Sequence, residues 1–172
     1  MAMMAARGLD RELRAQVADE IVNLIYGFAA AAAAAAFIPV PGLDVAAVTA
    51  DMWIMYTQIN RKLGISFSKN FMKSLGSAVI GNLTANLGYF AVGSLLKFIP
   101  GVGSVVGGGL MAATVFGMTV AAGWVYLKAL SKFYESGNKS ESALKDAVSD
   151  ILKDDQKGIK DAFAEGKRNY KK

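Results

Sequence analysis

The sequence predicts an all-α protein, with four apolar helices arranged as two helical hairpins and an amphipathic helix after them. Three observations predict this fold class. The 172 residues are 53% hydrophobic and 19% charged. Uncharged stretches cover residues 21–43, 74–96 and 98–127, each long enough for a helix to cross or nearly cross a bilayer. With a mean hydropathy of +0.33, these stretches indicate a membrane-embedded domain over residues 21–133.

The first hairpin follows from an alanine-rich helix and two prolines. Residues 1–20 form a charged, amphipathic start, and the first helix is expected from Asp10 to Phe37. Proline lacks an N–H and restricts the preceding residue, so Pro39, Pro41 and Gly42 are expected to form a tip. Asp44 is then placed to cap a second helix over residues 44–62, which Gly64 ends.

The second hairpin repeats this plan. Its first helix is expected from Ser66 or Ser68 to Phe98 and its second to about Phe133. The Phe-Ile-Pro sequence at residues 37–39 recurs 61 residues later at 98–100, which predicts two similar hairpins. The second tip consists of Pro100, Gly101 and Gly103.

The C-terminal region, residues 138–172, is predicted to be a cytoplasmic amphipathic helix with a basic tail. Apolar residues recur at helical spacings over residues 139–164 on a charged background. Asn138 and Glu141 have the spacing of a capping box at its start.

Each apolar helix is flanked by basic residues at the end that lies away from its hairpin tip. By the positive-inside rule these ends are cytoplasmic, so both termini are expected in the cytoplasm and both tips in or across the membrane. Asp51 is the exception to an apolar second helix. A carboxylate at the bilayer centre is costly, so this helix is expected to be buried among the others or only partly inserted.

Five polar residues are candidates for burial within this apolar domain. Two explanations remain open for Asp51: it bonds Asn82, Asn86 or Tyr89 on the third apolar helix, or it lines a pore with Asn82 and Asn86 in an assembly of several copies. Asp44 and Lys97, near the two tips, could pair if the hairpins lie side by side. The five candidates are Asp44, Asp51, Asn82, Asn86 and Lys97.

Small residues recur every four positions on the last apolar helix, at Gly109, Ala113, Gly117 and Ala121. Such a ladder lets helices approach closely in lipid. It predicts either packing inside one chain or a homo-oligomer. Four aromatic residues lie toward the charged helix ends, where they suit either a membrane interface or core packing: Trp53, Tyr56, Trp124 and Tyr126.

Several function classes are disfavoured by composition. The chain has no Cys and no His, which removes thiolate and imidazole metal sites, Cys nucleophiles and His-based triads. The glycine-rich residues 101–109 lack the Gly-Lys-Ser/Thr of a phosphate-binding loop. The sequence has no continuous basic stripe with interleaved aromatic residues, so nucleic-acid binding is not expected. We therefore expect no catalytic residues, no metal and no cofactor.

Motifs over about residues 22–127 resemble a known family. An alanine-rich helix precedes Phe-Ile-Pro-Val-Pro-Gly-Leu-Asp at residues 37–44, and a helix ending in Leu-Gly-Ile leads to Phe-Ile-Pro-Gly-Val-Gly-Ser at 98–104. This order resembles a bacterial membrane-associated domain of unknown function that occurs downstream of small GTPase domains and also alone. The resemblance implies a protein of the bacterial inner membrane with a possible separate GTPase partner.

Three hypotheses follow for the function. The leading one is a non-enzymatic, oligomerising scaffold or anchor that shapes or marks a membrane. The second is a pore or channel, and the third a peripheral or soluble adaptor for a GTPase. Lipid contact, homo-oligomerisation and a GTPase partner are the associations expected.

Overall fold

The computed structural model describes residues 16–35, 43–87 and 106–170, and within them the side chains of all but residues 16, 43–49 and 106–108. These residues form helices and no strands. The predicted tip residues Pro39, Pro41, Gly42, Pro100, Gly101 and Gly103, together with Lys97, lie outside the described residues. The helices are α2 (Gln16–Ala35), α3 (Leu43–Lys62), α4 (Lys69–Leu87), α6 (Val106–Glu135), α7 (Glu141–Asp154) and α8 (Gln156–Tyr170).

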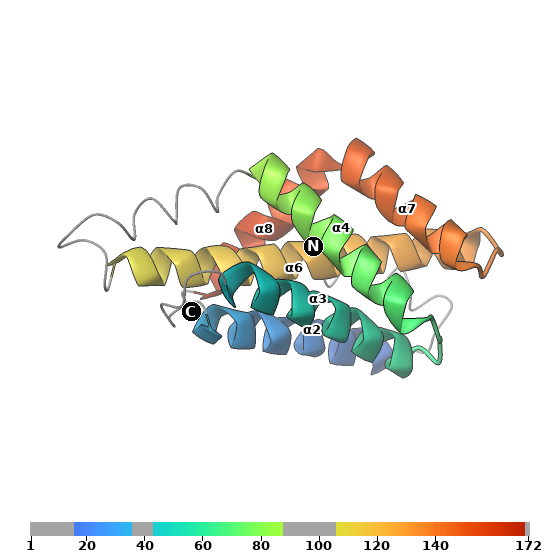
Figure 1. Ribbon diagram of the computed structural model, residues 1–172, viewed down its shortest axis with the longest axis horizontal. Coiled ribbons are helices and arrows are strands. Elements are labelled where there is room, and N and C mark those ends of the chain that lie inside the picture. Colours follow the sequence, from blue (N-terminus) through green and yellow to red (C-terminus); the bar gives the residue numbers. More distant parts are fainter. Residues whose placement is uncertain (1–15, 36–42, 88–105, 171–172) are drawn as a thin grey trace.

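The first four helices run alternately up and down, as two side-by-side hairpins require. Figure 1 shows the last residues of α2 and α4 and the first residues of α3 and α6 toward one end of the molecule, on the left. We call this the tip end and the opposite end the base end. At the base end, Lys62 Nζ lies 2.6 Å from Glu20 Oε2, joining the end of α3 to the start of α2.

The longest helix, α6, forms the centre of the bundle. It packs closely along α2, while α4 packs mainly on α3 and touches α6 less. The alanine face of α2 provides this close packing, because Ala29 and Ala33 are buried against Ala112, Phe116 and Val120 of α6. A Cβ at Gly123 of α6 would lie 2.7 Å from Ile25 Cγ2. Small residues on both helices thus set their separation.

The turn between α3 and α4 follows the predicted glycine signal. Gly64 has φ +67° and lies two residues after the last residue of α3. A left-handed conformation is costly for residues with a Cβ, so glycine suits this helix end. Ile65 N–H then donates to the Asn60 carbonyl at 2.9 Å, which closes the last turn.

The C-terminal region differs from the prediction of one helix over residues 139–164. Asp155 separates α7 from α8: it caps the end of α7, and its carboxylate accepts a hydrogen bond from Gly158 N–H at 3.0 Å. A carboxylate that binds a free N–H in this way starts a new helix. The hydrophobic spacing continues across the break, so periodicity alone did not reveal it.

The predicted capping box at Asn138 is also wrong. Ser140 is the N-cap of α7, and its side chain accepts from Ala143 N–H at 3.2 Å. Asn138 instead accepts from Ser140 N–H, which tightens the preceding turn. Glu141 does not reach back to a cap: its carboxylate accepts from Ser68 N–H at 2.8 Å and thereby joins α7 to the start of α4.

Two of the described helices are long and apolar enough to cross a membrane, rather than the four predicted. They are Val17–Ala35 and Gly109–Glu135. Within the most apolar stretch of the second, 94% of the residues are buried in the bundle, against 39% in the first. Of these two described helices, the one with the more apolar stretch is therefore covered by its own neighbours.

Candidate membrane-facing end and basic groove

Among the described residues, the surface that α2 exposes toward the tip end is uncharged and mostly small. On α2 the exposed residues beyond Glu20 include Asn23, Gly27, Ala30 and Ala34, which share one helix face. Among the described residues, the large hydrophobic side chain that is exposed is Leu110, at 40%, in the second turn of α6. This end is therefore the described surface best suited to contact lipid.

The charged helix α8 lies directly against the apolar helix α6. A Cβ at Gly117 of α6 would lie 2.8 Å from the Phe163 carbonyl oxygen, and one at Gly166 of α8 would lie 2.8 Å from Gly117 Cα. Contacts this short require glycine on both helices, because a side chain would force the backbones apart. The packing places the charged outer face of α8 beside the middle of α6.

An aromatic cluster holds the last turn of α8. Phe116 of α6 lies between Tyr26 of α2 and Tyr170 of α8, with ring centroids 5.8 Å and 5.5 Å away. Tyr26 Oη donates to Glu165 Oε1 at 3.4 Å and accepts from Asn169 Nδ2 at 2.7 Å. The cluster thus carries a polar edge beside an apolar body, as aromatic residues at a membrane interface do.

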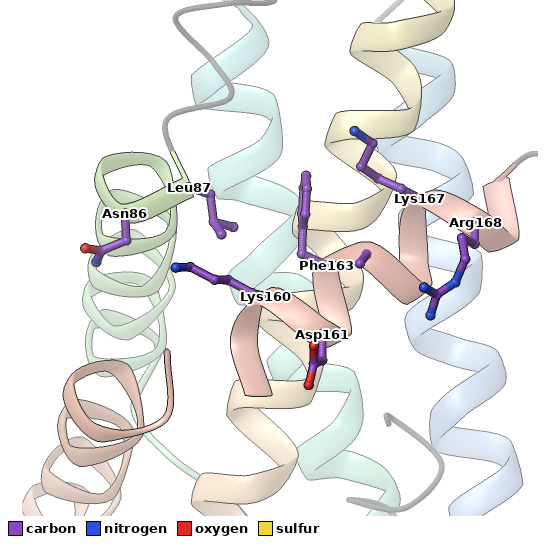
Figure 2. A pocket seen from close by; sticks show the side chains of 8 residues that line it. Asn86, Leu87, Lys160, Asp161, Phe163, Lys167 and Arg168 are labelled. Atoms are coloured by element: carbon purple, nitrogen blue, oxygen red, sulfur yellow. The ribbon is translucent and has the colours of Figure 1, made fainter. Parts of the chain in front are cut away.

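A groove of about 600 Å³ opens between α8 and the end of α4. Figure 2 shows Lys160 extended from α8 toward the part of α4 that carries Asn86 and Leu87. Leu87 and Phe163 are buried, at 9% and 4% exposed, and give the groove an apolar floor. Its charged lining consists of Lys160, Lys167, Arg168 and Asp161, a formal charge of +2 from three cations and one carboxylate.

The buried polar centre of the bundle lies elsewhere, and it combines Tyr56 and Tyr126 with Asn60, which the sequence analysis did not single out. Tyr126 Oη donates to Asn60 Oδ1 at 2.7 Å, and Tyr56 Oη donates to the Ala122 carbonyl at 3.1 Å. The two tyrosine rings stack 4.0 Å apart. These bonds join α3 to α6 inside the core. Asn60 falls one helical turn after Tyr56 on the apolar face of α3, the spacing that could have revealed it.

The polar candidates predicted from the sequence do not belong to this buried centre. Asn86 is exposed, Asn82 and Asp51 are half-buried, and the side chains of Asp44 and Lys97 lie outside the described part. Asn86 Nδ2 donates to Asn82 Oδ1 at 2.8 Å, one turn apart on α4. Asp44 lies one residue inside α3, which begins at Leu43.

The small-residue ladder of α6 faces its own chain. Ala113, Gly117 and Ala121 are buried, and Gly117 meets α8, a partner that the sequence did not suggest. Gly109 has no atom within 4 Å of where its Cβ would lie. Of the four aromatic residues with two possible roles, Tyr56, Trp124 and Tyr126 are buried in the core. Trp53 is half-buried and lies beneath Lys69 and Lys73.

In the described part of the chain, no group of three or more His, Cys, Asp or Glu residues is arranged to hold a metal ion. No family model matches the chain, and no solved structure matches it. One curated bacterial protein aligns with it over 131 residues at 34% identity. The chain is similar to magnetosome membrane protein 22. This relative comes from Magnetospirillum gryphiswaldense.

The alignment with magnetosome membrane protein 22 covers 73% of the chain and 63% of the relative. The chain thus spans somewhat less than two thirds of the relative that it matches. The name of the relative, together with two helices long and apolar enough to cross a membrane, supports a bacterial, membrane-associated protein.

Proposed function

We propose that this protein is a non-enzymatic scaffold of a bacterial membrane, inserted into one leaflet through its tip end. The base end, with its positive charges and the first residues of α2, stays in the cytoplasm. Magnetosome membrane protein 22 is by name a component of a magnetosome membrane. We propose a membrane of this kind as the site where the scaffold acts.

The packing of α8 on α6 carries this proposal. If α6 crossed the bilayer, the exposed residues Lys160, Asp161 and Arg168 of α8 would lie beside its middle, inside the hydrocarbon. Each charge at that depth costs about 2.5 to 3.5 kcal/mol on insertion scales. If insertion from the tip end stops before the level of these charges on α8, the cost is avoided and Leu110 still lies in lipid.

The length of α6 fits this depth. Gly117, where α8 packs, lies eleven residues after the start of α6 at Val106. At about 1.5 Å per residue this segment is about 16 Å long, close to half of a hydrocarbon core of roughly 30 Å. The aromatic cluster of Tyr26, Phe116 and Tyr170 then lies near the level of the lipid headgroups, where such side chains are favoured.

Self-association is the second part of the proposed scaffold. The ladder on α6 is occupied by α8, so we propose that copies meet through exposed small-residue faces instead. On α4 this face includes Ser77, Gly81 and Ala85, all exposed. Small side chains let helices of two copies approach closely. A GTPase made separately is proposed as a partner for the cytoplasmic base end.

A second candidate function is a peripheral adaptor that does not insert. It is favoured by the burial of nearly every large hydrophobic side chain in the described residues. Extraction of membranes with alkaline carbonate distinguishes the two. The scaffold remains in the pellet after extraction, whereas a peripheral adaptor is released into the supernatant. Release of the bulk of the protein would contradict the inserted scaffold.

A further inference from the structure

We propose that the groove between α4 and α8 binds the phosphate headgroup of an anionic phospholipid. This inference rests on the proposed membrane insertion and adds a lipid class to it. Two features of the groove support it: a cationic rim with an apolar floor, and a position at the level where lipid headgroups are expected.

The rim has the charge and reach that a lipid phosphate requires. Lys160 is exposed and extends from α8 toward α4 (Figure 2), and the exposed Arg168 and half-buried Lys167 also line the groove. The Lys167 ammonium lies 5.4 Å from the centre of the Phe163 ring, so this cation lies over the apolar floor of the groove. Asp161 lowers the net charge to +2 and disfavours deep entry of a second anion.

The floor suits the part of a lipid that follows the phosphate. Leu87 and Phe163 are buried beneath the rim, and Ala164 is half-buried beside them. Glycerol and the first methylenes of an acyl chain can rest on these side chains. A soluble anion such as inorganic phosphate would gain only from the rim, so the apolar floor favours a lipid.

The position along α6 agrees with this ligand. The Lys167 stem lies at Gly117, since a Cβ there would be 2.9 Å from Lys167 Cγ. That level is about 16 Å from the start of α6, and lipid phosphates lie just outside a hydrocarbon leaflet of about 15 Å. The groove therefore opens where the headgroups of the inserted leaflet are expected.

Vesicle binding tests this site directly. The whole protein is mixed with vesicles of phosphatidylcholine alone or with 30% phosphatidylglycerol, and binding is measured by flotation. The test variant is Lys160→Gln with Lys167→Gln and Arg168→Gln. The control changes three exposed lysines outside the groove, Lys145→Gln with Lys153→Gln and Lys157→Gln, which removes the same total charge.

The wild-type protein is expected to bind both vesicles and to prefer the anionic ones. Each cation near an anionic surface strengthens binding by roughly fivefold. Asp161 offsets part of this gain. In the groove variant, the preference for anionic over neutral vesicles is therefore expected to fall by on the order of tenfold to a hundredfold, while binding to neutral vesicles remains. The control variant keeps most of the preference. Circular dichroism verifies that each variant retains the helical content of the wild type.

Three results would overturn the inference. Equal loss in the groove and control variants would show that only total charge matters, and an unchanged preference in the groove variant would place the lipid elsewhere. Saturable binding of inorganic phosphate that requires the three groove cations, without their affecting vesicle preference, would assign the groove to a free anion. Absence of binding to either vesicle would instead contradict the proposed membrane insertion itself.

Discussion

Gly117 and Gly166 lie against each other where α6 crosses α8, so close that a Cβ on Gly166 would be 2.8 Å from Gly117 Cα. This contact joins α6, which has the more apolar of the two candidate membrane spans described, to the highly charged helix α8. It explains why the small-residue ladder of α6 is buried without a second copy. It also limits how deeply α6 can enter a bilayer.

Replacing Gly117 with alanine is expected to destabilise the protein. The new Cβ would lie 2.8 Å from the Phe163 carbonyl oxygen, a backbone atom that cannot move alone. Overpacking of this kind costs about 1 to 3 kcal/mol, and the midpoint of thermal unfolding should fall by several degrees. Gly81→Ala on α4 is the matched control, since no atom lies within 4 Å of that position; it should leave stability unchanged or raise it.

Gly117→Leu distinguishes packing within one chain from packing between copies. We expect it to loosen α8 in the monomer, with lower helicity and faster proteolysis after α7. If crosslinking in membranes instead showed loss of an oligomer from an intact, fully helical monomer, the ladder would face another copy.

Asp155 is expected to make the packing of α8 sensitive to acid. The Lys128 ammonium, hydrogen bonded to the carboxylate, holds the pKa of Asp155 below its ordinary value, and the Gly158 N–H acts in the same direction. Its contribution is therefore complete above the ordinary pKa of 3.8 and is lost as pH falls through the lower folded value.

Asp155→Ala should lower the free energy of unfolding by about 1 kcal/mol at pH 7, the typical loss when a helix cap is replaced by alanine. The difference in unfolding free energy between wild type and this variant should vanish in strong acid. Asp154→Ala is the control, because Asp154 is an exposed neighbour. A difference that stays constant from pH 7 to pH 2 would show that the carboxylate charge does not contribute.

The two buried tyrosines should differ in what their hydroxyl groups contribute. Tyr126→Phe leaves Asn60 Oδ1 without its 2.7 Å donor inside the core, which costs about 1 to 3 kcal/mol. Tyr56→Phe removes a donor from the Ala122 carbonyl, which lies within α6 and keeps its helical bond, so the loss is about 1 kcal/mol or less. Chemical unfolding measures the free energy of unfolding of both variants, and Tyr126→Phe should lose more of it than Tyr56→Phe. Equal losses would contradict this prediction.

Local patterns in the sequence predicted the positions of the first four helices well, but they did not predict which helix packs against which. Proline, glycine and the alanine run mark helix ends and a close-packing face, and Gly64 ends α3 as expected. The pairing of Gly117 with Gly166 could not be predicted, because helical spacing shows that a face is small but not which helix meets it. The division of the tail at Asp155 depends on Lys128, 27 residues away, which local spacing does not reveal.

Insertion through one leaflet is tested most directly by depth along α2. Single cysteines at Asn23, Gly27, Ala30 and Ala34 lie on one exposed face, in a chain without any other cysteine. Each carries a spin label or fluorophore, and its depth is measured with lipid-attached and aqueous quenchers.

We predict depth that increases steadily from Asn23, in water, to Ala34, in hydrocarbon. The aromatic cluster at Tyr26 should mark the headgroup level. A helix that crosses the bilayer with its centre near Gly27 would instead place Asn23 in hydrocarbon as well, because the two residues are only about 6 Å apart along the helix, and a peripheral protein would give four aqueous positions. Either of those profiles would contradict insertion through the tip end.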